Sequence, residues 1–242
     1  MNNRFFCAVV TVALSLTISG CALQSGTVAE GLAYYDAGEY KNAIGILKSL
    51  GQDGDSQAQN ALGVMYENGQ GVDVDYKQAL SWYELAAAQD NDSAQFHIGM
   101  LYARGMGVQQ SHVEALKWFR RAAVNGSSNA QYQLGMQALK GQGEPVNPQQ
   151  AFIWFKQASA QGDSQAQLQL GTMLANGYGI RQDVVLGYMW LEIAGGMDEP
   201  VAIQATQLLA DKMSKKDIAL AQKMARQCIK QNYKACDRIA RN

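Results

Sequence analysis

The chain has little of what catalysis or metal binding requires. Its 242 residues include only two histidines, His97 and His112, and four cysteines. It contains no Gly-x-Ser-x-Gly motif, no His-Glu-x-x-His motif and no cysteine–histidine constellation. His97 follows Phe96 in a helical pattern and His112 opens a predicted helix, so packed or solvated imidazoles are expected. We therefore expect no catalytic residues, no bound metal and no cofactor.

The chain also has no large excess of positive or negative charge. The chain holds 20 Lys and Arg against 21 Asp and Glu, for a net charge of −1. This balance argues against nucleic acid as a partner and against a polybasic membrane patch. Proline is rare, with three in the whole chain. Few prolines, together with many alanines and glutamines, favour an all-helical protein.

What the chain does have is an internal repeat. Three residue types recur four times at intervals of 36 residues: Gly63, Gly99, Gly135 and Gly171; Trp82, Trp118, Trp154 and Trp190; Ala58, Ala94, Ala130 and Ala166. A repeat of this length is typical of a solenoid, in which small helical units stack and contact only their neighbours. Such proteins usually bind other molecules.

The first half of each repeat predicts one helix. In the second repeat, Asp92 is the predicted N-cap, and Gly105 ends the helix in a left-handed conformation. Gly99 lies in mid-helix, where glycine costs up to about 1 kcal/mol relative to alanine. We interpret it as a site where two helix backbones approach closely. Gly107 provides a positive φ in the loop. Equivalent N-caps are Ser56, Ser128 and Ser164, equivalent helix ends are Gly69, Gly141 and Gly177, and equivalent loop glycines are Gly71, Gly143 and Gly179.

The second half predicts another helix, which starts at Ser111 with Glu114 three residues later, a capping box. Equivalent pairs are Asp75 with Gln78 and Asn147 with Gln150, and Pro148 occupies the first helical position in the third repeat. The expected buried stripe of this second helix consists, in the second repeat, of Ala115, Trp118, Phe119 and Ala122. The tryptophans are therefore expected in the core, and the Gly-x-Gly loops are expected to be turns.

These residues resemble the Sel-one-like repeat family, a branch of the tetratricopeptide superfamily. The second repeat carries the family pattern at Ala94, Ile98-Gly99, Tyr102, Gly105, Gly107-Val108, Ala115, Trp118-Phe119 and Ala122-Ala123. The resemblance implies an all-α, right-handed superhelical solenoid of antiparallel helix pairs. We expect a tetratricopeptide-like hairpin over residues 28–55, four 36-residue repeats over 56–195, and a C-terminal helical cap over 196–242. Gly187 departs from the pattern by replacing the helix alanine, and the periodicity lapses beyond Ala194.

The N-terminus has the layout of a signal peptide over residues 1–20. One positive charge, Arg4, precedes a mostly apolar stretch from Phe5 to Ile18, which is short for a membrane span. The run from Ile18 to Cys21 resembles a bacterial lipoprotein box, which implies lipidation at Cys21. Ordinary cleavage after Ala22 is the alternative. In lipoproteins, Ala rather than Asp after the lipidated cysteine implies the outer membrane of a Gram-negative bacterium. Residues 21–27 would then form a tether, with six residues after Cys21 spanning about 20 Å.

Two cysteines remain for the folded chain, Cys228 and Cys236, with seven residues between them. A continuous helix would separate their Cα atoms by about 12 Å, too far for a disulfide. A turn near Asn232 would bring them together, which suits an oxidising compartment. The spacing also resembles that of the cysteine-rich members of the family. Two free thiols are the alternative.

The superfamily resemblance implies that the first helix of each pair lines a concave groove. Carrying the positions over from the helix glycine gives Asn60, Val64, Glu67, Phe96, Met100, Arg104, Tyr132, Met136, Lys140, Leu168, Thr172 and Asn176. Aromatic and methionine side chains make an adaptable apolar surface, and Arg104 with Lys140 suits a carboxylate. Alternatively, Phe96 and Tyr132 simply pack the interface between repeats.

These observations predict a non-enzymatic scaffold, anchored by lipid to the periplasmic face of the outer membrane. Its expected partner is a peptide or a helix of another envelope protein. One alternative is a structural subunit or regulator of an envelope machine for secretion, polysaccharide export or motility. A murein-acting enzyme is the other, and catalytic carboxylates in a cleft would favour it.

Overall fold

The computed structural model describes residues 26–197, 199–234 and 236, and in this part the chain forms twelve helices and no strand. The predicted signal peptide and Cys21 lie outside the described residues. The helices are α1 (Val28–Asp36), α2 (Tyr40–Gln52), α3 (Ser56–Asn68), α4 (Tyr76–Ala87), α5 (Asp92–Arg104), α6 (His112–Val124), α7 (Ser128–Lys140), α8 (Pro148–Ser159), α9 (Ser164–Asn176), α10 (Val184–Gly195), α11 (Pro200–Ala210) and α12 (Lys215–Lys230).

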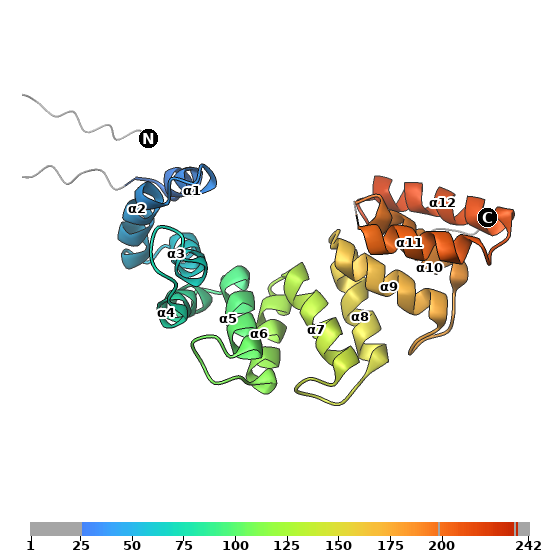
Figure 1. The fold of residues 1–242 in the computed structure, drawn as a ribbon, viewed down its shortest axis with the longest axis horizontal. Coiled ribbons are helices and arrows are strands. Elements are labelled where there is room, and N and C mark those ends of the chain that lie inside the picture. The colour runs from blue at the N-terminus through green and yellow to red at the C-terminus, as the bar shows by residue number, and fades with distance from the viewer. Residues whose placement is uncertain (1–25, 198, 235, 237–242) are drawn as a thin grey trace, which may run out of the picture.

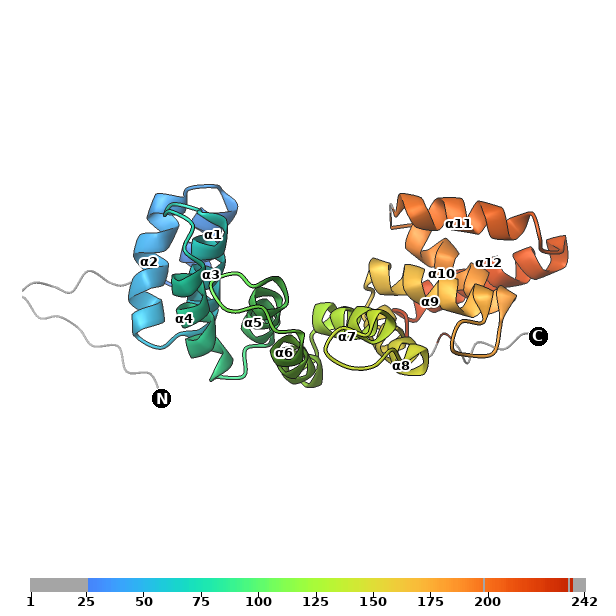
Figure 2. The same ribbon diagram turned by 60° about the horizontal axis from the view of Figure 1, so that its bottom comes forward.

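The helices follow one another along an open arc (Figure 1), and the view turned by 60° shows the same succession (Figure 2). Consecutive helices from α1 to α11 pack against each other. In addition, α3 contacts α1 and α5, and α9 contacts α11. Neighbouring units approach most closely on the inner side of a curved stack, so these contacts place the first helices there. The predicted all-α solenoid is confirmed.

The helix ends agree with the sequence pattern, except at one set of N-caps. Gly69, Gly105, Gly141 and Gly177 are the left-handed C-caps, as predicted. Asp75, Ser111 and Asn147 cap the second helices through their side chains, also as predicted. Ser56, Asp92, Ser128 and Ser164, however, are the first helical residues and not the N-caps. Asp55, Asn91, Ser127 and Asp163 are the caps, one residue earlier.

At three of the four positions the cap shifts because the preceding side chain reaches the free N–H groups. Ser127 has the extended backbone of an N-cap but makes no side-chain capping hydrogen bond. Asp55 has an extended backbone, and its Oδ1 accepts hydrogen bonds from the N–H groups of Gln57 and Ala58, both 2.9 Å long. Asn91 similarly accepts from the N–H of Ala94 at 2.9 Å. A residue with helical φ and ψ cannot cap its own helix in this way.

The mid-helix glycines have a different role from the one expected. A Cβ added to Gly99 would lie 2.5 Å from Cε1 of Phe119, and one added to Gly63 would lie 2.4 Å from the Tyr83 ring. Gly135 faces Phe155 in the same way, also at 2.5 Å. Each glycine therefore makes room for an aromatic ring of its own helix pair. The expectation of a close approach between two backbones is wrong for these three repeats.

The fourth repeat does bring two backbones together. A Cβ on Gly171 would lie 3.0 Å from the carbonyl oxygen of Gly187, and a Cβ on Gly187 would lie 2.7 Å from the backbone nitrogen of Ala175. The smaller Leu191 stands where the other repeats have an aromatic ring. The unusual Gly187 is thereby explained, because an alanine there would collide with α9.

Three of the four tryptophans lie beside the core, whereas Trp190 is 4% exposed and belongs to the C-terminal hydrophobic core, as predicted. Trp118 is half-buried, whereas the next residue, Phe119, is 0% exposed. Trp118 packs on the hydrophobic cluster around Tyr83 and Ile98, formed by α4 and α5. Trp82 and Trp154 occupy the equivalent position against the clusters before them. Each of these indole rings therefore joins its second helix to the preceding unit.

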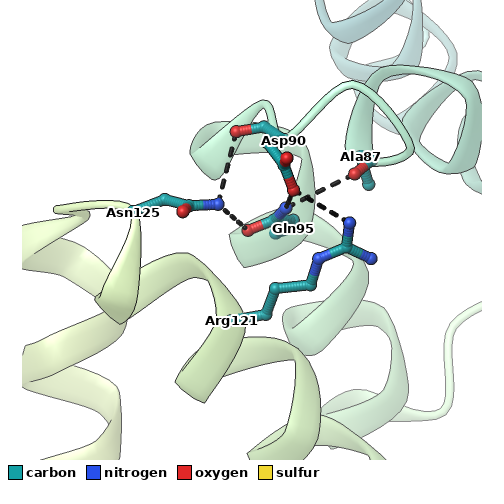
Figure 3. Close-up of polar contacts among 5 residues, drawn as sticks. All are labelled: Ala87, Asp90, Gln95, Arg121 and Asn125. Atoms are coloured by element: carbon teal, nitrogen blue, oxygen red, sulfur yellow. Dashed lines mark hydrogen bonds and ion pairs between the residues drawn. The ribbon is translucent and has the colours of Figure 1, made fainter.

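A buried amide ladder also joins the repeats. Gln59, Gln95, Gln131 and Gln167 are each at most 6% exposed, and each Nε2 donates to the carbonyl oxygen eight residues earlier. Their Oε1 atoms accept from a side-chain amide thirty residues later, in the pairs Gln89 to Gln59, Asn125 to Gln95 and Gln161 to Gln131. Figure 3 shows one rung, in which Asn125 also donates to the carbonyl oxygen of Asp90.

The ladder ends at the fourth repeat. Thirty residues after Gln167 stands Met197, which carries no donor, and the Oε1 of Gln167 has no partner among the described residues. An unpartnered buried oxygen costs roughly 1–3 kcal/mol. The ladder was not anticipated from the sequence, although the four glutamines recur at the repeat length.

The repeat register continues past the point where the periodicity seemed to lapse. α11 begins at Pro200, 36 residues after α9 begins at Ser164, and Ala202 is fully buried like Ala166. α11 packs on α10 and contacts α9, as a first helix does. α12 also packs on α10 rather than pairing with α11. The C-terminal helices are therefore one more first helix, followed by a helix in a new position.

Cys228 and Cys236 lie at disulfide distance, with the two sulfurs 2.01 Å apart and the Cα atoms 5.0 Å apart. α12 ends at Lys230, and the chain reverses through Asn232 and Tyr233, whose φ angles are 51° and 62°. This is the predicted turn. It lays Tyr233 against the C-terminal hydrophobic cluster, near Gly162.

Candidate functional site

The predicted groove residues come from α3, α5, α7 and α9, the first helices of the four repeats. None of the twelve is fully buried. Arg104, Lys140 and Asn176 are exposed, and the other nine are half-buried. These helices lie on the inner side of the arc, and their twelve side chains contribute to the surface of that side. We call this surface the inner face.

The apolar residues of the inner face both pack and remain partly open. Phe96 and Met100 rest on the cluster that contains Phe119 and Leu134, and the centroids of the Phe96 and Phe119 rings are 5.9 Å apart. Tyr132 lies 5.8 Å from Phe155 in the same arrangement. The alternative that Phe96 and Tyr132 pack the interface between repeats is supported, and their role in binding stays a prediction. The rings help to join units, and each keeps a share of its surface accessible.

Glu67 is engaged in a polar cluster and not free for a ligand. Its Oε2 accepts a hydrogen bond of 2.7 Å from the Tyr83 hydroxyl and lies 3.4 Å from Nδ1 of His97. The Tyr83 and His97 rings are stacked, with their centroids 4.8 Å apart. No partner for His97 could be assigned from the sequence, since Glu67, Tyr83 and His97 stand on three different helices.

The cluster shifts the ionisation of its members. Burial alone would raise the pKa of Glu67, but hydrogen bonds from His97 and Tyr83, together with the charges of His97 and Arg104, hold that pKa below its usual value. Burial, and then the hydrogen bond to Glu67, raises the pKa of Tyr83 well above its usual range. A carboxylate held ionised beside a neutral phenol is a poor proton donor at neutral pH.

Beyond Asn176, the inner face continues onto α11. A hollow of about 210 Å³ is lined by Thr172 and Asn176 together with Leu208, Leu209 and Lys212, among others. Leu208 is 67% exposed. Leu208 and Leu209 of α11, and Lys212 shortly after that helix, were missed in the sequence. Lys212 stands 36 residues after Asn176, so continuing the repeat count through the C-terminal segment would have found them.

Thr172 and Asn60 are two polar residues of the inner face that differ in their hydrogen bonding. The hydroxyl of Thr172 donates to the carbonyl oxygen of Leu168 at 2.8 Å, so it is satisfied within its own helix. The Oδ1 atom of Asn60 is shielded from solvent and has no partner among the described residues. Asn60 is therefore the polar side chain of this surface with an unused acceptor.

The described residues contain no group of three His, Cys, Asp or Glu side chains that could hold a metal ion. Within the same ranges, no helix has the length and apolarity that a membrane span requires. The chemistry offered by the inner face is instead that of a binding surface. It combines half-open aromatic and methionine side chains with cationic residues, Arg104, Lys140 and Lys212, near the ends of three helices.

Stacked helix pairs and the inner face define the protein as an all-α repeat solenoid. In each repeat a mid-helix glycine of the first helix lies against a side chain of the second, and we call these four residues, Gly63, Gly99, Gly135 and Gly171, the glycine seam. The Sel1 repeat model matches residues 56–91, 92–127, 128–163 and 164–197, which together exceed half of the chain. The chain therefore belongs to the Sel1 repeat family, whose members typically act as protein–protein interaction scaffolds and are generally not catalytic.

Two solved structures resemble the chain along most of its length. A Sel1 repeat protein from Oxalobacter formigenes is 26% identical, with a TM-score of 0.71, over 86% of this chain and 84% of that one. The protein c5321, described as a protective antigen present in uropathogenic Escherichia coli strains and as displaying an SLR fold, is 28% identical, with a TM-score of 0.75. That similarity covers 90% of this chain and half the length of c5321. A search of curated proteins gives no match.

Proposed function

We propose that the protein is a lipid-anchored scaffold of the bacterial envelope, and that its inner face binds a peptide or a helix of another envelope protein. The observation that carries the proposal is the composition of that face. Phe96, Met100, Tyr132 and Met136 are half-buried and adjacent, and Arg104 and Lys140 are exposed beside them. Aromatic, methionine and arginine side chains are the types enriched in protein interfaces.

The charges of this face favour one kind of ligand. Arg104 and Lys140 lie at the last turns of α5 and α7, and Lys212 follows α11 in the same register. Three cations along one edge suit a peptide that places carboxylates beside its apolar residues. The hollow beside Leu208 and Leu209 would take an apolar side chain of that peptide.

A pulldown from envelope extract tests the site. Replacing Arg104 and Lys140 together with Glu should lose the partner, because like charges then face its carboxylates. Leu208→Asp should weaken capture as well, since this side chain is exposed and its replacement leaves the core intact. The control is Lys117→Glu with Arg181→Glu, which reverses two exposed charges away from the first helices. Equal recovery with all variants would refute the proposed face.

Crosslinking in intact cells, followed by mass spectrometry, would identify the partner. Crosslinks from the inner face to one envelope protein support a recruiting scaffold. If deletion of the gene instead dissolves a large complex whose subunits do not contact the inner face, the protein is a structural subunit. If the protein is a recruiting scaffold, a synthetic peptide from the crosslinked segment should bind the wild type and not the Arg104/Lys140 variant.

The anchor is a separate part of the proposal and needs its own test. It rests on the lipoprotein-like run that ends at Cys21. Cys21→Ala should abolish labelling with radioactive palmitate and release the chain from membranes. Ala22→Asp should move it from the outer to the inner membrane. A chain that stays unlabelled and is cleaved after Ala22 would refute the anchor without affecting the inner face.

A further inference from the structure

The described chain is electrically polarised from end to end. Residues 26–91 hold ten Asp and Glu against three Lys and Arg, a net charge of −7. Residues 215–234 hold six Lys and Arg against one Asp, a net charge of +5. These segments lie at opposite ends of the arc (Figure 1). The near-zero charge of the whole chain conceals this separation.

The acidic end exposes a helix face that is covered in every internal unit. Gly31 corresponds to Gly63, and both adjoin a residue of their own second helix. Leu62 and Met65 of α3 are both 0% exposed and pack against the preceding unit. In this alignment the corresponding residues of α1 are Glu30 and Ala33, and both are exposed. In the internal junctions a second helix lies there, as α2 lies against α3. No helix of the described residues covers this face of α1.

The basic end presents a matching helix. α12 buries Ala221, Met224, Ala225 and Cys228 against the body of the protein. The opposite side exposes Lys216, Ala219, Arg226 and Lys230, which recur at helical spacing. This outer stripe is basic, with a small residue among the charges. The exposed face of α1 is acidic, with Ala29 and Ala33 beside Glu30 and Asp36.

We infer that copies of this chain associate head to tail, with the outer stripe of α12 from one copy against the exposed face of α1 from the next. The charges choose this pairing. Two acidic ends repel each other and two basic ends repel each other, whereas an acidic end attracts a basic one. The small side chains of both faces let two helices approach. A heterologous contact of this kind leaves a free end on each copy, so it produces open chains of molecules.

Zero-length crosslinking tests the contact directly. A carbodiimide joins a carboxylate to an amine only when they touch, so it should link Glu30 or Asp36 to Lys216 or Lys230. The full-length chain in a mild detergent is mixed from ¹⁴N-labelled and ¹⁵N-labelled preparations. Crosslinked peptides that combine the two labels prove contact between copies. Links found only within one label would show that the chain closes on itself, which overturns the inference.

A charge exchange provides the second test. One variant carries Lys216→Glu, Arg226→Glu and Lys230→Glu; the other carries Glu30→Lys and Asp36→Lys. Each alone should associate at least about tenfold more weakly in sedimentation velocity, because like charges then meet. Mixing the two should restore association, since the altered ends now complement each other. The Lys117/Arg181 control should associate like the wild type. Circular dichroism verifies that each variant is folded.

The dependence of association on salt and the binding of the chain to lipid vesicles provide two further tests. Since exposed charges are screened beyond about 10 Å at 0.1 M salt, association should weaken steeply as salt is raised toward about 0.5 M. Failure of the mixed variants to associate, with both folded, overturns the inference. The inference is also overturned if copies of the chain do not associate and the wild type instead binds phosphatidylglycerol vesicles, with this binding lost in the α12 variant. In that case the basic stripe faces an anionic membrane.

Discussion

Substitution of Gly99 by alanine tests the glycine seam, on which each repeat depends. A Cβ at this position would lie 2.5 and 2.6 Å from two carbons of the Phe119 ring. Carbon atoms in contact are normally about 3.5–4.0 Å apart, so the ring would have to move by about 1 Å. Phe119 is 0% exposed and is held by its neighbours, so there is no free space to move into. Overpacking of this kind costs about 1–3 kcal/mol.

Alanine also improves helix propensity by up to about 1 kcal/mol, which offsets part of that cost. We expect Gly99→Ala to lower the free energy of unfolding by about 1–2 kcal/mol. Gly45→Ala is the matched control, because Gly45 lies in the interior of α2 with nothing within 4 Å of an added Cβ. There only the propensity term acts, and the substitution should stabilise the protein. The two glycine variants should therefore change stability in opposite directions.

A second substitution distinguishes the proposed collision from a general intolerance of α5. The fourth repeat has Leu191 opposite its seam glycine, so Phe119→Leu should relieve the collision in Gly99→Ala. The double-mutant cycle should show a favourable coupling of at least about 0.5 kcal/mol. Urea denaturation measures the energies, and hydrogen exchange of α5 and α6 amides locates the effect within the array. Equal effects of Gly99→Ala and Gly45→Ala would refute the seam.

Three further predictions concern the polar and covalent links. Asn125→Ala removes the donor to the buried Oε1 of Gln95 and should cost roughly 1–3 kcal/mol in urea denaturation; an unchanged midpoint would show that the rung contributes nothing. The pKa of Glu67 is lower in the folded chain than its ordinary value of 4.5. The ionised carboxylate therefore stabilises the fold above pH 4.5, and this stability is lost as the pH falls through the folded-state pKa. The melting-temperature difference between wild type and Glu67→Gln should therefore shrink below about pH 4, and a constant difference from pH 7 to pH 3 would contradict this. Cys236→Ser should destabilise the C-terminal helices by about 2.5 kcal/mol through lost loop closure, and a reducing agent should lower the stability of the wild type and not of the variant.

The sequence predicts the repeat architecture well because a 36-residue period imposes local structure four times. Glycine at the helix ends and Asx or serine residues at the second helices act over three or four residues, so their roles could be assigned without knowing the fold. The cap of the first helices was misplaced by one residue. Two adjacent residues, such as Asp55 and Ser56, are both good caps, and only the backbone angles decide between them.

The candidate site was predicted in outline and corrected in detail. The inner face follows from the helix phase, and its residues are indeed open or half-open. The engagement of Glu67 was not predictable, because its partners Tyr83 and His97 lie 16 and 30 residues away on other helices. The extension onto α11 was visible in the repeat count but was concealed because Met213 and Lys215 stand where the other repeats have their loop glycines.

By itself, the sequence determined the period, the helix boundaries to within about one residue, and the face of each helix that looks inward. These properties depend on contacts between residues that are close along the chain. The tertiary structure alone decided that a ring rather than a backbone fills each seam in the first three repeats, that the buried glutamines form a ladder, and that α12 packs on α10. Those outcomes depend on which distant side chains compete for the same volume or the same hydrogen-bonding group, and a one-dimensional pattern does not contain that information.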